Sequence, residues 1–139
     1  ASKTGQDFFR SCVYYLSEVI QVRYAGVFKL LKTAPPQLEN LAFWDGEKWS
    51  DQLIYNLAGT PCEPVIKMGQ SCHFSKNVQI LFPNDPELAQ LQAQSYWGIP
   101  LFDSNQNIIG ILMIIDIHNK QLTVSQESIL KIFADRAGA

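Results

Sequence analysis

The feature that most constrains this chain is a run of residues from Ile108 to Ile117 that is apolar with almost no alternation. A strand that is apolar on both faces must be covered on both, whereas a half-exposed strand alternates between apolar and polar residues. The run is too short to cross a bilayer as a helix, which requires about 20 residues. It therefore predicts the central strand of a sheet with other layers packed on both of its sides.

Both ends of the chain predict helices. Apolar residues recur at helical spacing from Phe8 to Ile20 and fall in one arc, and this helix is expected to end near Val22. The last segment is expected to become helical at Thr123 or Ser125. Its apolar residues cover an arc of roughly 200°, about twice what one core-facing stripe needs: Ile129, Leu130, Ile132, Phe133, Ala134 and Ala137. We therefore expect the last helix to serve two surfaces, the sheet and a second one.

Further strands are predicted at residues 24–32, 38–44, 52–57 and 95–102, and the central strand is expected to reach His118. Asp45-Gly46, between two tryptophans, predicts a tight hairpin because these residue types tolerate a positive φ. A polar loop of residues 103–107 joins the last two strands. Hairpins without a regular alternation of strand and helix favour an antiparallel sheet with helices on its faces.

Two proline-containing strings predict short helices between the strands. Thr60 is expected to cap the first, with Pro61 in its first turn and Cys62 on its inner side. Asp85-Pro86 repeats this arrangement and starts a helix expected to run to Ala93. Between the two helices, residues 73–78 are expected to be extended.

Composition limits the classes of function. At 139 residues the chain fits one domain, and 47% hydrophobic with 17% charged residues is ordinary for a globular protein. The net charge is -2 with dispersed Lys and Arg, which argues against nucleic acid as a partner. Three cysteines, an odd number, favour a reducing compartment such as the cytoplasm. Because the chain starts without Met and stops inside a helical pattern, we expect residues 1–139 to be a single domain cut from a longer protein.

Five strings, in their order along the chain, resemble the GAF family of sensory domains. The resemblance runs from about Gly5 to the last residue. The strings are similar to those of the GAF domains found in bacterial sensor kinases, cyclases and response regulators. The strings are Gly59-Thr60-Pro61-Cys62, Phe82-Pro83-Asn84-Asp85, Ser95 to Leu101 (SYWGIPL), Gly110 to Asp116 (GILMIID) and Ile129 to Ala139 (ILKIFADRAGA). Asn107 stands where many relatives have Gly, and Asn tolerates a left-handed turn.

The resemblance implies an α+β fold of the GAF/PAS-like kind. A central antiparallel sheet of about five to six strands would carry the terminal helices on one face. Short helices on the other face would enclose a pocket for a small ligand. The resemblance further implies a regulatory, non-enzymatic module of a bacterial signalling protein, such as a sensor histidine kinase, a response regulator or a cyclic-dinucleotide enzyme. Such a module would relay its signal through its terminal helices to an attached output domain.

Site residues follow from the same resemblance and from residue type. Small-molecule pockets are mostly apolar with a few polar groups, and the candidate lining residues are Cys62, Phe74, Phe82, Tyr96 and Met113. The same side chains would serve equally well as core. The resemblance also implies a homodimer through the terminal helices, with Ile129, Ile132, Phe133 and Arg136 as the candidate contact residues.

Metal and bilin sites lack residues that their chemistry needs. Cys72 and His73 are adjacent on an extended stretch and would point to opposite faces, and no Cys pair has zinc-ligand spacing, so no metal site is predicted. Bilin-binding GAF domains attach the pigment to a Cys in the helix before the SYWGIPL-like strand. Residues 86–93 contain no Cys, which argues against a covalent bilin. No cofactor is identified.

A nucleotide site and an active site are also poorly supported. Cyclic-nucleotide GAF domains carry an Asn-Lys pair followed by Asp-Glu, and this chain has Asn119-Lys120 followed by Gln126-Glu127. Gln126 cannot form an ion pair with Lys120, so an ordinary loop before a capped helix is preferred. The chain has two histidines and lacks the motifs of hydrolases, P-loop enzymes and zinc proteases.

Two alternatives to a ligand sensor stay open. One is a structural dimerisation module whose pocket is filled by its own side chains. The other is a GAF enzyme that reduces methionine sulfoxide, which would need a reactive thiol near the pocket. Cys62 at a helix start would have a lowered pKa, whereas burial would raise it, and the sequence leaves both readings open.

Overall fold

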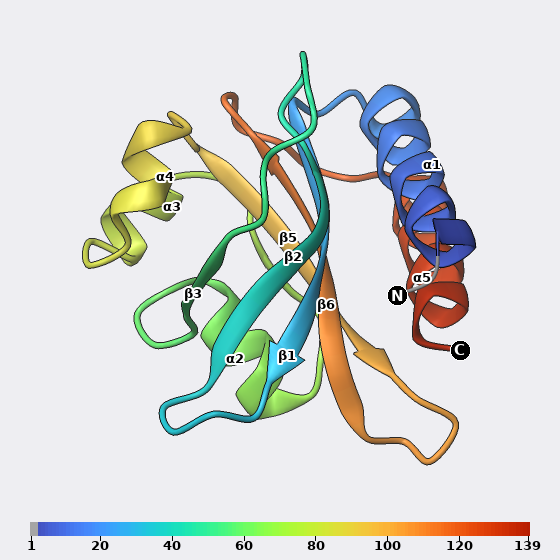
Figure 1. The fold of residues 1–139 in the computed structure, drawn as a ribbon. Helices are drawn as coiled ribbons and strands as arrows, with labels where there is room; N and C mark the ends of the chain where they lie inside the picture. Colours follow the sequence, from blue (N-terminus) through green and yellow to red (C-terminus); the bar gives the residue numbers. More distant parts are fainter. Residues whose placement is uncertain (1–2) are drawn as a thin grey trace.

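The computed structural model describes residues 3–139, which form a six-stranded antiparallel sheet with helices on both faces (Figure 1). The strand order is β3-β2-β1-β6-β5-β4. In chain order the elements are α1 (Lys3–Ile20), β1 (Tyr24–Leu31), β2 (Gln37–Trp44), β3 (Ile54–Asn56), α2 (Cys62–Met68), β4 (Cys72–Phe74), α3 (Val78–Leu81), α4 (Pro86–Gln90), β5 (Ser95–Phe102), β6 (Ile108–Asp116) and α5 (Val124–Gly138). The predicted α+β architecture is therefore confirmed.

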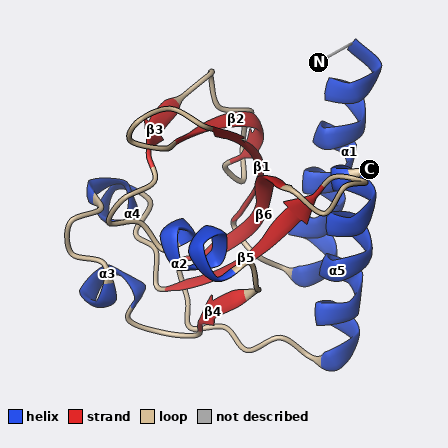
Figure 2. Cartoon of the chain, turned by 90° about the horizontal axis from the view of Figure 1, so that it is seen from below, coloured by secondary structure: helices blue, strands red, loops and turns tan. Residues whose placement is uncertain are grey.

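The helices divide into two layers. The terminal helices α1 and α5 lie side by side on one face of the sheet, α1 against β1 and β2 and α5 against β5 and β6. The short helices α2, α3 and α4 lie on the other face, as the view from below makes plain (Figure 2). None of the helices within residues 3–139 combines the length and hydropathy needed to cross a membrane.

The strand β6 occupies the middle of the sheet, between β1 and β5. Its residues from Gly110 to Asp116 are all buried, which confirms the prediction of a strand covered on both faces. Gly110 is required where β6 passes β1, because a β-carbon there would overlap the carbonyl oxygen of Phe28. The central strand pair is thus built on a close backbone approach that only glycine allows.

Two hydrophobic cores lie on the two faces of the sheet. Alternate residues of β1 separate them: Ala25 and Val27 face the terminal helices, whereas Tyr24 and Phe28 face the short helices. The core under the terminal helices includes Leu16 from α1 and Leu130 from α5, both almost completely buried. The second core is the one that contains the candidate site.

The last helix begins as the sequence predicts. Thr123 caps α5 by accepting a hydrogen bond from the Gln126 amide at 3.1 Å, and the Gln126 side chain accepts one from the Thr123 amide at 3.0 Å. Gln126 is thereby occupied in a capping box. Ile129 and Phe133 pack against the core, whereas Ile132 is 56% exposed and Arg136 is exposed. The broad apolar arc is therefore only partly covered by the sheet and by α1.

Several local predictions are wrong at element boundaries. Thr60 does not cap α2, because its hydroxyl donates to the Leu57 carbonyl at 2.8 Å and Pro61 takes the cap position. The helix expected to reach Ala93 ends at Gln90, shortly before Gln92 adopts a φ of 54°. The left-handed residue of the β5–β6 loop is Gln106 rather than Asn107.

One helix, α3, was not predicted from the sequence. Residues 73–78 were expected to be extended, but β4 ends at Phe74 and α3 begins at Val78. This helix spans only four residues, so it has no room to display a helical period.

Candidate functional site

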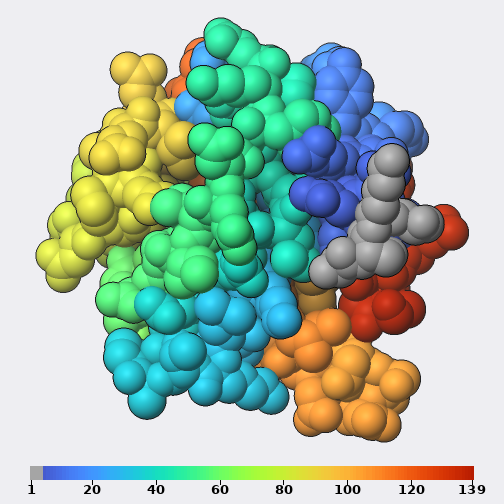
Figure 3. Space-filling view, in the orientation of Figure 1, coloured from blue at the N-terminus to red at the C-terminus, as the bar shows by residue number. Residues whose placement is uncertain are grey.

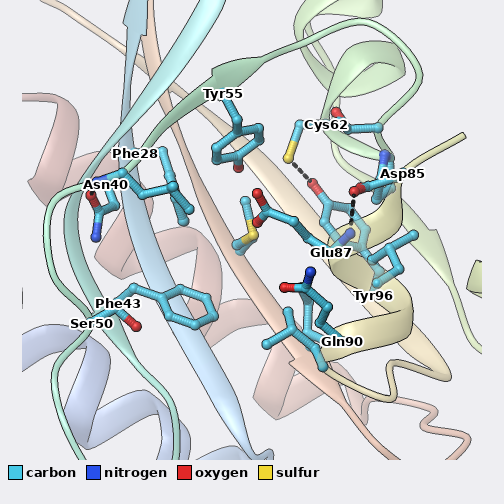
Figure 4. A pocket seen from close by; sticks show the side chains of 17 residues that line it. Phe28, Asn40, Phe43, Ser50, Tyr55, Cys62, Asp85, Glu87, Gln90 and Tyr96 are labelled. Carbon is cyan, nitrogen blue, oxygen red and sulfur yellow. Dashed lines mark hydrogen bonds between the residues drawn. The ribbon is translucent and has the colours of Figure 1, made fainter.

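A pocket of about 270 Å³ opens between the sheet and the short helices, on the face opposite the terminal helices (Figure 4). Five strands (β1, β2, β3, β5 and β6), α2, α4 and the segment before β3 contribute to it. The residues that line it are Phe28, Asn40, Phe43, Ser50, Leu53, Tyr55, Thr60, Pro61, Cys62, Asp85, Glu87, Leu88, Gln90, Leu91, Tyr96, Met113 and Ile115. Its volume is near the lower end of the range for small-molecule sites, which is about 300–1,000 Å³.

One wall of the pocket consists of aromatic rings from three neighbouring strands. The Phe28 ring meets the Phe43 ring edge-on at 5.9 Å between centroids, and meets the Tyr55 ring edge-on at 5.8 Å. Such tilted pairs are the favoured geometry for aromatic side chains. Because β1, β2 and β3 are consecutive in the sheet, their inward-facing rings form one continuous surface.

The neighbouring wall contains a buried thiol and a second buried phenol, and the Tyr55 hydroxyl also makes a side-chain hydrogen bond with Cys62. The Tyr96 hydroxyl donates a hydrogen bond to the Cys62 sulfur at 3.0 Å. Burial raises the pKa of Cys62 to about 12, and burial is also the main cause of the raised pKa of Tyr96. The thiol and the phenol are therefore both neutral at physiological pH, which answers the question that the sequence left open for Cys62.

The helix α4 brings polar groups to the pocket. Asp85 caps α4 by accepting a hydrogen bond from the Glu87 amide at 3.1 Å, as predicted. The Glu87 side chain extends into the pocket, and the Gln90 amide also turns toward it (Figure 4). Burial raises the pKa of both Asp85 and Glu87, and the negative charge of Asp85 adds to the effect at Glu87. The pocket therefore carries carboxylates whose negative charge is poorly solvated.

Residues 49–53, which we call the bridging segment, separate the pocket from α1. Asn40 of β2 anchors the segment: its side chain donates to the Asp51 carbonyl at 2.9 Å and accepts from the Leu53 amide at 2.5 Å. Ser50 and Leu53 line the pocket. In the space-filling view the segment, in green, lies between the blue atoms of α1 and the yellow atoms of α3 and α4 (Figure 3).

The other side of the bridging segment contacts α1. A second, polar depression of about 440 Å³ is lined by Ser50 and Gln52 together with Gln6 and Arg10 of α1. The Arg10 guanidinium lies 5.2 Å from the centroid of the Trp49 ring. The indole rings of Trp44 and Trp49 are 5.0 Å apart, and Tyr14 of α1 contacts Trp44 edge-on at 5.2 Å. One short segment thus touches both the pocket and a terminal helix.

Only some of the predicted pocket residues line the pocket. Cys62, Tyr96 and Met113 line the pocket, whereas Phe74 and Phe82 lie outside its lining. Phe74 and Phe82 instead meet edge-on at 5.1 Å and pack at the margin of the second core. Both choices rested on residue type alone, which does not reveal where the layers separate.

Several lining residues escaped the sequence analysis. Phe28 and Phe43 belong to strands with other residues packed on both faces. The alternation of apolar and polar residues therefore did not identify them as pocket residues. Glu87 was not predicted, because it lies in a short helix among other polar residues. The one available signal was Asp85-Pro86, which fixed the start of α4 and with it the direction in which Glu87 points.

Cys72 and His73 point to opposite faces of the sheet, as predicted. Cys72 packs against the second core, whereas the His73 ring stacks on Trp97 at 4.3 Å between centroids. The Cys72 thiol is half-buried and the His73 imidazole is exposed. Within residues 3–139, His, Cys, Asp and Glu form no group of three that could hold a metal ion.

Comparisons with known proteins agree with this architecture. The family model of the GAF domain matches residues 4–139. No curated protein matches the sequence. The blue-light absorbing form of the PixJ GAF domain from Thermosynechococcus elongatus is similar in structure, with a TM-score of 0.76 and 13% identity over 98% of this chain and 83% of that chain.

Two further similar structures come from different classes of protein. The GAF domain of a two-component sensor histidine kinase from Bacillus halodurans has a TM-score of 0.74 and 16% identity, over 95% of this chain and 89% of that chain. A type II free methionine-R-sulfoxide reductase from Thermoplasma acidophilum has a TM-score of 0.74 and 20% identity, over 98% and 90%. At these identities the likeness shows a shared fold.

Proposed function

The chain belongs to the GAF family, and from this premise we propose that it is a sensory module that binds a small molecule in the pocket and relays its presence to the terminal helices. The observation that carries the proposal is the position of the bridging segment. Ser50 and Leu53 face the pocket, while Trp49 contacts Arg10 of α1. A ligand that displaces this segment would change the environment of α1 directly.

The relay requires two arrangements of the bridging segment with different affinities for the ligand. A ligand shifts such an equilibrium only by its differential affinity for the two states. Leu53 is 42% exposed, and three of the hydrogen bonds that hold the segment against β2 involve Asn40, while Ser50 and Gln52 make one each. The proposed movement would therefore centre on the contacts with Asn40, since the moving parts of ligand-binding proteins are drawn from solvent-exposed segments of this kind.

The terminal helices would form the output surface. Tyr14, Tyr15 and Ile132 are all exposed on α1 and α5, although they are large apolar or aromatic side chains. We propose that this surface pairs with a second copy of the chain, and that the helices connect to an output domain in a cytoplasmic bacterial signalling protein. A two-component sensor histidine kinase from Bacillus halodurans contains a GAF domain of this fold, which supports that context.

We propose further that the pocket has no enzymatic role. The likeness to a methionine-R-sulfoxide reductase raises the alternative, which depends on a nucleophilic thiolate. Burial holds Cys62 in the thiol form, because its pKa is raised to about 12, and the pKa of Cys72 is also raised. A reductase assay on the wild type and on a Cys62→Ser/Cys72→Ser variant tests this point. Thiol-dependent turnover of methionine sulfoxide would overturn it.

Native mass spectrometry of protein purified from cells tests the sensory proposal. It would be combined with a thermal-shift screen of nucleotides, amino acids, amines and tetrapyrroles. A bound small molecule, or a compound that raises the melting temperature, is the expected result because ligands of the folded state stabilise it. A protein with no bound molecule and no shift across the screen would instead favour a structural dimerisation module.

A further inference from the structure

The charges around the pocket have one sign. Among the described residues that line it, Asp85 and Glu87 are the only charged ones, and none is Lys, Arg or His. Asp85 is committed to capping α4 through the Glu87 amide. The Glu87 carboxylate, in contrast, makes no ion pair or side-chain hydrogen bond with any residue from 5 to 139. An anionic ligand would therefore meet uncompensated negative charge.

The Glu87 carboxylate is half-buried and faces the aromatic wall (Figure 4). Removing a carboxylate from water without a partner is costly, and the raised pKa of Glu87 reflects that cost. A cation placed beside Glu87 would compensate for its charge. The rings of Phe28 and Tyr55 line the same pocket, and aromatic rings attract cations.

The remaining lining favours an organic cation over a metal ion. Tyr96 and Met113 border the pocket from β5 and β6, and most of the wall is apolar. A hard metal ion needs several oxygen ligands, and no group of three possible ligands comes together in the described part of the chain. A pocket of about 270 Å³ suits a compact molecule.

We propose that the ligand of this pocket is a compact organic ammonium ion, held between the Glu87 carboxylate and the rings of Phe28 and Tyr55. This inference rests on the proposed sensory function and specifies its ligand class. A pocket that binds a phosphate or carboxylate ligand would instead present basic side chains to it.

Matched probes that differ in charge and share a shape provide the test. Choline and its uncharged analogue 3,3-dimethylbutan-1-ol form one pair, and cyclohexylmethylamine and cyclohexylmethanol form the other, with cyclohexanecarboxylate as the anionic probe. Isothermal titration calorimetry at millimolar ligand concentration would give each affinity. We expect at least one ammonium probe to bind about tenfold or more tightly than its uncharged partner. Cyclohexanecarboxylate should bind most weakly.

The variant Glu87→Gln keeps the shape of the side chain and removes its charge. It should lower the affinity for the ammonium probe about tenfold and leave the affinity for the alcohol nearly unchanged. Glu18→Gln is the matched control, because Glu18 is exposed on α1 and the substitution makes the same change in net charge. The affinities of this control variant for both probes should equal those of the wild type.

Two results would overturn the cation proposal. One is equal or tighter binding of the uncharged or anionic probes, and the other is the absence of binding by both ammonium probes. After either result, the sensory function would still be tested by the screen of purified protein. A bound neutral or anionic molecule found there would support the sensory function. Only the combined absence of probe binding, of a co-purified molecule and of any thermal shift would count against both.

Discussion

At the scale of single residues, the pocket is defined by groups whose charge the fold controls. Burial keeps Cys62 and Tyr96 neutral, and it raises the pKa of Glu87, which has no basic residue beside it among the described residues of the pocket lining. Neutral donors and one poorly solvated carboxylate suit recognition better than nucleophilic chemistry. Residue type alone did not reveal this, because the pKa of a thiol at a helix start depends on how deeply the helix packs.

The buried thiol predicts how stability falls at alkaline pH. The unfolded chain releases the Cys62 proton near pH 9, whereas the folded protein keeps it until about pH 12, so the folded state binds more protons in this interval. Stability is therefore complete below pH 9 and falls as pH rises, by about 1.4 kcal/mol per pH unit for one such group. Urea denaturation at a series of pH values should show a shallower decline for Cys62→Ala than for the wild type.

Cys72→Ala provides the control for this experiment, because its thiol is only half-buried. Its stability should decline with pH almost as that of the wild type does. Tyr55 and Tyr96, whose pKa values are also raised, add a decline of the same sign to all three proteins. An unchanged slope in Cys62→Ala would show that the thiol is not held neutral by burial.

At the scale of elements, the sheet depends on a close approach between β1 and β6. Gly110 lies opposite Lys29 of β1 and Leu101 of β5, in the middle of the sheet. The apolar pattern of residues 108–117 was enough to predict a central strand, because only a central strand is covered on both faces. The pattern did not reveal that its glycine is a steric requirement.

Gly110→Ala should destabilise the protein by about 2 kcal/mol or more, because the new methyl group would overlap the Phe28 carbonyl oxygen and force the strands apart. The midpoint of urea denaturation measures the loss. Ile109→Thr, an exposed β-branched neighbour on the same strand, should change stability by less than about 0.5 kcal/mol. Comparable effects of the two substitutions would contradict the close packing of β1 against β6.

At the scale of the whole molecule, the sheet separates the pocket, which lies under the short helices, from the terminal helices that we propose as the output surface. The resemblance to the GAF family implied this division, whereas the order of patterns along the chain favoured only an antiparallel sheet with helices on its faces. The outline of the pocket could not be predicted. Phe74 and Phe82 were expected in it and Phe28 and Phe43 were not, because the gap depends on how α2 and α4 sit over the sheet. That distance is a tertiary property.

The output surface predicts a dimer that a single charge would weaken. Ile132→Glu places a carboxylate on the exposed face of α5 and should raise the dimer dissociation constant about tenfold or more, measured by sedimentation velocity. Lys131→Gln is the matched control, since it makes the same change in net charge on an exposed position of the same helix. A wild-type chain that stays monomeric at high concentration would contradict pairing through this surface.

The central claim is that occupancy of the pocket reaches α1 through the bridging segment, and the three tryptophans report on it. Trp49 belongs to the segment and Trp44 contacts it, whereas Trp97 stacks on His73 away from both. The nitrogen-15-labelled indole signals would be followed by NMR during titration with choline, or with the molecule that co-purifies. The signals of Trp49 and Trp44 should shift along the binding curve while that of Trp97 stays in place. Saturation of the pocket with Trp49 and Trp44 unmoved would contradict the relay.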